Sequence, residues 1–252
     1  MPAAVRDAIT RDGAFISTRW TMVLDAAASQ TPGDQAHSAL SELCRIYWRP
    51  IFFFLRRQGH SPHDAQDLTQ GFFAHLIESR AYARADREKG RFRSFLLGAL
   101  KHFVAHARAH ERTQKRGGGM IFAQLDDAAV AEAETHAANW HTWSAEHIYE
   151  REWAESLLRR SLDRLAEESA LAGKEELFER LSSHLAVTNE AAVPYDELAV
   201  RLGRPVATLR SDVARLRSRY RVLLREEVRG TVADASEVDG ELRYLCETLA
   251  AA

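Results

Sequence analysis

Cysteine is scarce in this chain. Cys44 and Cys246 are the two cysteines among 252 residues, so the sequence holds neither a disulfide framework nor a CxxC pair of the kind that binds structural zinc. It also lacks any run of about 18 apolar residues, which predicts no membrane insertion. The first residues, MPAAVRDAITRDG, do not have the apolar core of a secretory signal. We therefore expect a reducing, cytoplasmic location.

Catalytic and nucleotide-binding motifs are missing as well. The chain contains no G-x-x-x-x-G-K-[ST] phosphate loop, no G-x-S-x-G nucleophile motif and no H-E-x-x-H zinc motif. The glycine run at Gly117–Gly119 fits a linker or the end of a helix better than a phosphate loop. We predict that the protein is not an enzyme and uses no cofactor.

Charge is distributed unevenly, although the 34 basic and 36 acidic residues almost cancel. Residues 80–116 hold eleven cations against three carboxylates, and residues 201–225 hold eight cations against one carboxylate. Between these blocks, residues 126–155 hold eight carboxylates against one cation, and residues 226–252 are again acidic. Two basic blocks separated by an acidic segment indicate two nucleic-acid-facing modules on a linker.

Helical periodicity dominates and strand-type alternation is absent, which predicts an all-α fold of two helical domains joined by an acidic linker. The strongest helical patterns cover residues 20–28, 38–58, 62–77 and 92–116, and a further helical region follows the linker. We expect Pro50 to kink the second of these helices. The expected organisation is an N-terminal extension with one helix (1–37), a first helical domain (38–119), an acidic linker (120–147), a second helical domain with a C-terminal helix-turn-helix (148–226) and an acidic C-terminal extension (227–252).

The stretch 195–221 has the spacing of a helix-turn-helix. Ala199 is small enough for two helices to cross closely, Gly203 supplies a turn residue with positive φ, and Leu209 is the expected core anchor of the second helix. A recognition helix needs such an apolar side together with donors that enter the major groove. The candidate donors outside the apolar stripe are Arg204, Thr208, Arg210, Ser211 and Arg215. An ordinary helical hairpin with a solvated arginine face is the alternative interpretation.

The expected helix from Phe92 onward carries phenylalanines on one face and cations on the other. Because the phenylalanines share a face, we interpret them as core residues rather than as a platform for stacked bases. Arg93, Lys101 and Arg108 belong to the expected solvated face. His102, His106 and His110 recur every four residues, a spacing that can bind a divalent metal. We favour a polar face near phosphates over a metal site.

Two segments carry a resemblance to a known family. They are DAQDLTQGFF at 64–73 and GRFRSFLLGALKHFVAHAR at 90–108, followed by a linker and a terminal helix-turn-helix. In this order they resemble an alternative sigma factor of the extracytoplasmic-function type, within the sigma-seventy family of RNA polymerase subunits. The resemblance covers about residues 38–226. Its most specific part is the first segment, because family members carry close variants of D-A-x-D-L-x-Q-x-x-F there.

The resemblance implies a protein that binds core RNA polymerase and directs promoter recognition and transcription initiation. It implies a polymerase contact through Asp64, Asp67, Leu68 and Gln70. It implies minus-ten recognition and strand opening, with a loop at 80–91 that captures a flipped base, through Arg91, Arg93, Lys101, His102, His106, Arg108 and Arg112. It implies minus-thirty-five readout through Arg204, Thr208, Arg210, Ser211 and Arg215. Promoter DNA and core RNA polymerase are the expected partners, and an anti-sigma factor is a further candidate.

Some positions extend or depart from the family pattern. His102 and His106 stand where family members often carry Asn and Asp. Asp212 lies among the expected DNA contacts, where we expect it to hold a neighbouring arginine in place rather than to accept from a cytosine. We expect Arg217 and Arg219 to contact phosphates. The C-terminal extension has Val238, Leu242, Leu245 and Leu249 at helical spacing, which predicts a helix that packs on the second domain.

Two alternatives remain open at this point. A stand-alone helix-turn-helix transcriptional regulator explains residues 148–226 but leaves the DAQDLTQGFF segment and the basic helix unexplained. A metal-dependent enzyme that uses the histidine stripe is the weaker alternative.

Overall fold

The computed structural model describes residues 34–85, 91–111, 142–185, 192–232 and 234–251. Within these ranges the chain is mostly helical and contains no strand, which confirms the all-α prediction. None of the helices in these ranges combines the length and apolar character that a membrane crossing requires. The helix expected at 20–28 and nearly all of the expected linker lie outside the described residues.

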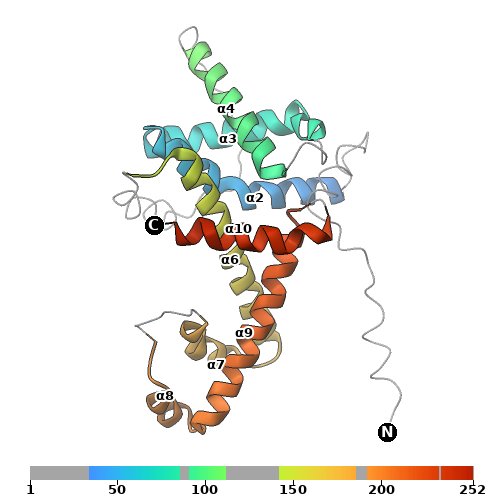
Figure 1. Cartoon of the computed structure of the whole chain (residues 1–252). Helices are drawn as coiled ribbons and strands as arrows, with labels where there is room; N and C mark the ends of the chain where they lie inside the picture. The colour runs from blue at the N-terminus through green and yellow to red at the C-terminus, as the bar shows by residue number, and fades with distance from the viewer. Residues whose placement is uncertain (1–33, 86–90, 112–141, 186–191, 233, 252) are drawn as a thin grey trace, which may run out of the picture.

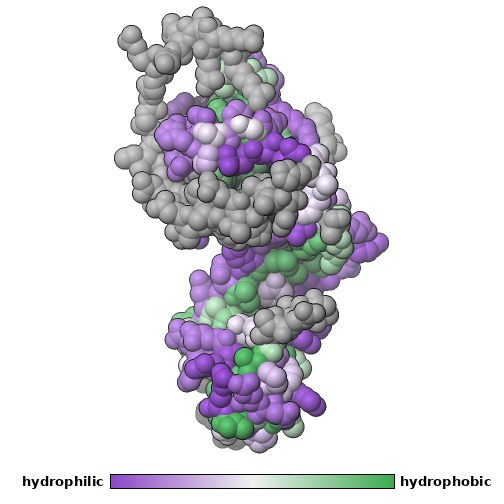
Figure 2. All heavy atoms as spheres, turned by 90° about the vertical axis from the view of Figure 1, so that its left-hand side faces the viewer, coloured by the Kyte–Doolittle hydropathy of each residue, from purple (hydrophilic) through white to green (hydrophobic). Residues whose placement is uncertain are grey.

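Eight α-helices are present in the described ranges. They are α2 (Asp34–Arg57), α3 (Pro62–Glu78), α4 (Phe92–Glu111), α6 (Ala145–Leu171), α7 (Glu175–Leu181), α8 (Tyr195–Leu202), α9 (Val206–Arg229) and α10 (Val238–Ala250). Helices α2, α3 and α4 cross one another at one end of the molecule, while α7 and α8 lie at the other end (Figure 1). Helices α6 and α9 connect the two ends, and in the space-filling view they form a narrower waist between them (Figure 2).

The larger apolar core lies at the α2 end. Helix α2 runs through Pro50 as one element, and it buries Ile51, Phe54 and Leu55 completely. Helix α3 begins as the sequence predicts, because the Ser61 hydroxyl accepts a hydrogen bond from the Asp64 backbone N–H at 3.1 Å. Aromatic side chains of α3 and aliphatic side chains of α4 complete this side of the core.

Helix α6 contributes to the cores at both ends of the molecule. Its first half buries Tyr149 and Trp153 completely within the larger core. Its second half buries Leu165 in a smaller cluster with Phe178 of α7 and Leu223 of α9. The expected domain boundaries at 148 and 226 therefore fall inside α6 and inside α9, because each helix continues through them.

The C-terminal extension forms helix α10, as its apolar spacing predicts. Helix α10 packs against α6 and α9, which belong to the expected second domain. However, its buried side chains Val238 and Leu245 join the larger core. The expected packing is therefore correct only in part, since these side chains lie in the core that α2, α3 and α4 also build.

Candidate nucleic-acid interface

Helices α8 and α9 are joined by three residues, and the geometry of this connection depends on glycine. Helix α8 ends at Gly203, whose φ of 60° and ψ of 32° lie in the left-handed region. Glycine adopts this conformation without the penalty that a Cβ atom brings. The Arg204 backbone N–H then donates to the Ala199 carbonyl at 3.1 Å, and α9 begins after Pro205. The predicted turn residue is confirmed.

A small apolar cluster fixes α9 against its neighbours. Leu209 and Val213 of α9 pack with Leu198 of α8 and Leu181 of α7, and none of the four side chains is more than 2% exposed. Burial of a leucine stabilises a fold by about 1.5–3 kcal/mol. The prediction that Leu209 is a core anchor is confirmed, and its burial sets which side of α9 faces solvent.

The five candidate donors of this region lie exposed around the start of α9. They are Arg204, Thr208, Arg210, Ser211 and Arg215. Asp212 lies among them, with its carboxylate 2.6 Å from Arg215 and 3.5 Å from Arg204. The Arg210 guanidinium lies 5.7 Å from the ring of Tyr195. Asp212 therefore pairs with neighbouring arginines, which is the role we favoured for it.

Farther along α9, two arginines pair with acceptors from other segments of the chain. Arg217 donates two hydrogen bonds to the His184 carbonyl, at 2.7 and 3.0 Å. Arg219 donates two to the Glu168 carboxylate, at 2.6 and 2.8 Å, and this pairing lowers the pKa of Glu168. These hydrogen bonds hold α9 in place, and the phosphate contacts expected of Arg217 and Arg219 remain a prediction.

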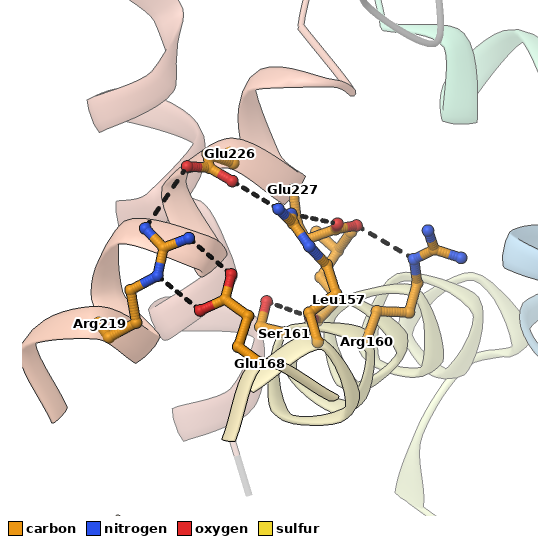
Figure 3. Close-up of polar contacts among 8 residues, drawn as sticks. Leu157, Arg160, Ser161, Glu168, Arg219, Glu226 and Glu227 are labelled. Carbon is orange, nitrogen blue, oxygen red and sulfur yellow. Dashed lines mark hydrogen bonds and ion pairs between the residues drawn. The ribbon is translucent and has the colours of Figure 1, made fainter. Parts of the chain in front are cut away.

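Figure 3 shows that Arg219 belongs to a larger ion-pair network between α6 and α9. Glu227 is 5% exposed and accepts from Arg160 and Arg164, each at 3.0 Å. Arg164 also donates to Glu226 at 2.6 Å. Shared partners make this a connected set rather than isolated surface pairs, which individually contribute little. The network aligns the helix that carries the candidate donors with the helix that reaches the larger core.

The candidate polymerase contacts lie along α3. Asp64 and Asp67 are exposed, whereas Leu68 packs partly against the larger core and Gln70 is half-buried. The Asp64 carboxylate lies 2.6 Å from the Ser61 hydroxyl, and this hydrogen bond lowers the pKa of Asp64. Asp67 lies 3.3 Å from His63 in the preceding turn. The carboxylates of Asp64 and Asp67 are thus exposed to solvent, whereas Leu68 packs partly against the larger core.

Arg93 differs from the prediction made for it. Its side chain is buried, with Nε 2.6 Å from the Glu150 carboxylate and Nη1 paired with Glu241. Its guanidinium lies over the ring of Trp153, at 4.1 Å from the centroid, and over the ring of Tyr244, at 4.8 Å. Burial disfavours the charge, but the two carboxylates outweigh it and raise the pKa of Arg93. The expectation that Arg93 shares a solvated face with Lys101 is wrong.

The other candidate residues of this helix differ in their availability. Arg91 is 40% exposed at its side chain and lies 3.0 Å from Glu241. Lys101 is exposed and pairs with Glu146 at 2.7 Å, which lowers the pKa of Glu146. His102 and His106 are exposed, with ring nitrogens 3.3 Å apart.

Two candidates cannot be placed in the same way. Arg108 lies in α4, but its side chain lies outside the described residues, as does all of Arg112. Among the side chains that the structure does describe, no group of three or more histidines, cysteines, aspartates and glutamates is placed to hold a metal ion.

Glu150, Glu241 and Tyr244 are the residues that the sequence reasoning missed. They surround the start of α4 but lie 57 to 151 positions away from Arg93 in the chain. The sequence signals that pointed to the two glutamates are the acidic excesses of residues 126–155 and 226–252, opposite in sign to the basic block at 80–116.

Comparison of the chain with protein-family models, with curated proteins and with solved structures finds no match. The residues and geometry described above therefore carry the functional assignment.

Proposed function

We propose that this chain is an alternative RNA polymerase sigma factor, which binds core RNA polymerase and directs promoter recognition and transcription initiation. The observation that carries the proposal is the α8–α9 pair. Leu209 anchors α9 while five polar side chains around its first turns are exposed. One buried stripe with donors opposite it is what a helix needs in order to read a major groove.

We assign the readout of duplex promoter DNA to the arginines at the start of α9. A guanidinium that donates two hydrogen bonds to a guanine discriminates against other bases by about 1–3 kcal/mol. Arg210 is exposed and forms no ion pair that competes with such a contact within the described residues. Arg215 is oriented by Asp212. We assign the upstream promoter contact to these two arginines, supported by Arg204, Thr208 and Ser211.

We assign polymerase binding to α3. Asp64 and Asp67 present carboxylates to solvent, a charge that suits a basic protein surface and not the phosphates of DNA. We assign strand opening to α4, whose exposed Lys101, His102 and His106 offer a polar surface. The acidic residues of α3 and the polar residues of α4 thus fit two different partners.

A stand-alone transcriptional regulator is the second candidate, and the position of Arg93 favours it. Arg93 is one of the residues assigned to promoter opening, yet it is held by two carboxylates inside the fold. A regulator needs only the surface of α9 to bind its operator, so this burial would not affect it.

Polymerase-dependent transcription separates the two candidates. We expect the purified chain to support promoter-specific transcription with core polymerase, and Asp67→Arg to weaken polymerase binding about tenfold while helicity is unchanged. The control is Asp196→Arg, which reverses an exposed carboxylate on α8, away from α3. DNA binding without polymerase binding would favour the regulator, and a folded Asp67→Arg variant with unchanged binding would overturn the assignment of α3.

A further inference from the structure

Helix α10 covers two of the cations that lie at the start of α4. Glu241 has no exposed surface, and its carboxylate pairs with both Arg91 and Arg93. The ring of Tyr244, one turn farther along α10, lies 5.1 Å from the Arg91 guanidinium and 4.8 Å from that of Arg93. We call Arg91, Arg93, Glu241 and Tyr244 the arginine clasp.

The rest of α10 is held by polar contacts and by apolar packing, in which Leu242 and Leu249 lie partly buried against the larger core. Asp239 pairs with Arg225 of α9 at 2.7 Å, and the Arg151 guanidinium of α6 donates to the Leu249 carbonyl at 3.2 Å. Val238 and Leu245 are its buried aliphatic residues. Figure 1 shows α10 crossing α6 below the layer of α2, at the surface of the molecule. A helix that lies on the surface of a protein can open locally without unfolding the helices beneath it.

The Glu241 carboxylate presents its oxygens to the guanidinium groups of both Arg91 and Arg93. A guanidinium binds carboxylate and phosphate oxygens with the same planar donor geometry. If α10 moves away, Arg93 keeps Glu150 as a partner, so its burial site does not lose all charge compensation. Arg91 loses its carboxylate partner and, already 40% exposed, faces solvent.

We propose that α10 is an intramolecular competitor of nucleic acid, in which Glu241 holds Arg91 and Arg93 until the phosphate backbone of a single DNA strand displaces it. The proposal rests on the proposed function for its biological setting, since strand opening is assigned to α4. Its chemistry requires only that the arginines bind either Glu241 or phosphate, one at a time. The C-terminal extension would then limit binding to single-stranded DNA until promoter contacts supply the energy to displace it.

Matched charge removals on α10 test the competition. Glu241→Gln and Asp239→Asn each remove one negative charge from this helix, but Asp239 pairs with Arg225 rather than with the clasp. The full-length variants are titrated with a fluorescent single-stranded oligonucleotide in several salt concentrations. We expect Glu241→Gln to bind about five- to tenfold more tightly than the wild type and Asp239→Asn to stay within about twofold. Since each phosphate contact on a single strand adds about 0.7 to the salt slope, we also expect a steeper slope for Glu241→Gln. Equal affinities for the two variants would overturn the proposal.

Hydrogen exchange on the wild type gives a second readout that does not depend on a variant that folds. We expect saturating oligonucleotide to increase the exchange of amides in residues 238–250 several-fold. Unchanged exchange in that segment at saturation would also overturn the proposal. If the chain fails to support transcription with core polymerase but both expected results are obtained, the proposed function is wrong and the clasp stands. If the chain supports transcription but the oligonucleotide and hydrogen-exchange experiments give the contrary results, the proposed function stands and the arginine clasp is wrong.

Discussion

Arg93 and Arg210 occupy comparable places in the sequence and different places in the molecule. Each lies in the first turns of an amphipathic helix within a strongly basic block. Arg210 is exposed, whereas Arg93 is 3% exposed between the carboxylates of Glu150 and Glu241. The difference teaches that local charge density does not decide whether a cation can reach nucleic acid. Carboxylates supplied by distant segments decide it, here by α6 and α10.

Removing the buried arginine gives the largest expected effect. Arg93→Ala leaves Glu241 and Glu150 without their shared partner in a site with little access to water, and we expect a loss of about 3–5 kcal/mol in the free energy of unfolding. Urea unfolding followed by circular dichroism measures it. Arg210→Ala, at an exposed position, should cost less than about 0.5 kcal/mol. Equal losses of unfolding free energy in the two variants would contradict the contrast between a buried Arg93 and an exposed Arg210.

The anchor of α9 gives the next effect. Leu209→Ala should destabilise the α7–α8–α9 end by about 2–5 kcal/mol, because it leaves a cavity at a site with no exposed surface. Val200 of α8 is 84% exposed, so Val200→Ala serves as the control and should change stability by less than about 0.5 kcal/mol. Hydrogen exchange across residues 195–216 would show whether the loss is confined to this end, and a loss at the α2 end instead would contradict the separation of the two clusters.

Two glutamates of α6 predict pH effects of opposite sign at the two ends of the molecule. Burial raises the pKa of Glu152 from an ordinary 4.5 to about 7, although Arg49 lies 3.4 Å away. The folded state then holds this proton more tightly than the unfolded state, so stability falls as the pH rises from 4.5 through 7. The pKa of Glu168 is lowered instead by the hydrogen bond with Arg219, so its contribution is lost as the pH falls.

Glu152→Gln isolates the first of these effects. The amide cannot ionise, so the variant should lose the decline between pH 4.5 and 7 and gain up to about 3 kcal/mol over the wild type at pH 8. The free energy of unfolding is measured by chemical denaturation at several pH values, with Glu168→Gln as the matched variant at an exposed position of α6. A Glu152→Gln variant whose stability follows the wild-type curve would show that the buried carboxylate does not titrate in this range.

The smallest effect concerns promoter selectivity. Arg210→Ala and Arg215→Ala should each reduce discrimination among upstream promoter sequences by about 1–3 kcal/mol, which corresponds to about 5- to 150-fold, without changing polymerase binding. Transcription from a library of randomised upstream elements measures the preference. Arg217→Ala is the comparison, since its guanidinium binds the His184 carbonyl and should affect stability more than selectivity. An unchanged preference in both test variants would remove α9 as the reading helix.

Local features of this protein could be derived from the sequence. Residues 62–77 were expected to be helical and α3 covers Pro62–Glu78, because the capping serine and the apolar period are local signals. Gly203 and Leu209 were placed correctly for the same reason: a left-handed turn and an apolar stripe depend on residues within a few positions of each other. Helix α2 continues through Pro50 as one element, so the proline does not end the helix. The core on both sides of that proline supports the helix there.

The sequence by itself determined the helical class, the limits of several helices, the α8–Gly203–α9 connection and the presence of two basic blocks, because each of these follows from neighbouring residues. The tertiary structure alone decided that α6 serves both cores and that Arg217 and Arg219 pair with the His184 carbonyl and the Glu168 carboxylate. It also decided that Arg93 is buried in a pairing with Glu241, which lies 148 positions farther along the chain. The physical reason is that burial and ion pairing depend on which distant segments of the chain come into contact. A periodic pattern in the sequence predicts that one face of a helix is buried, but it does not indicate which segment buries it.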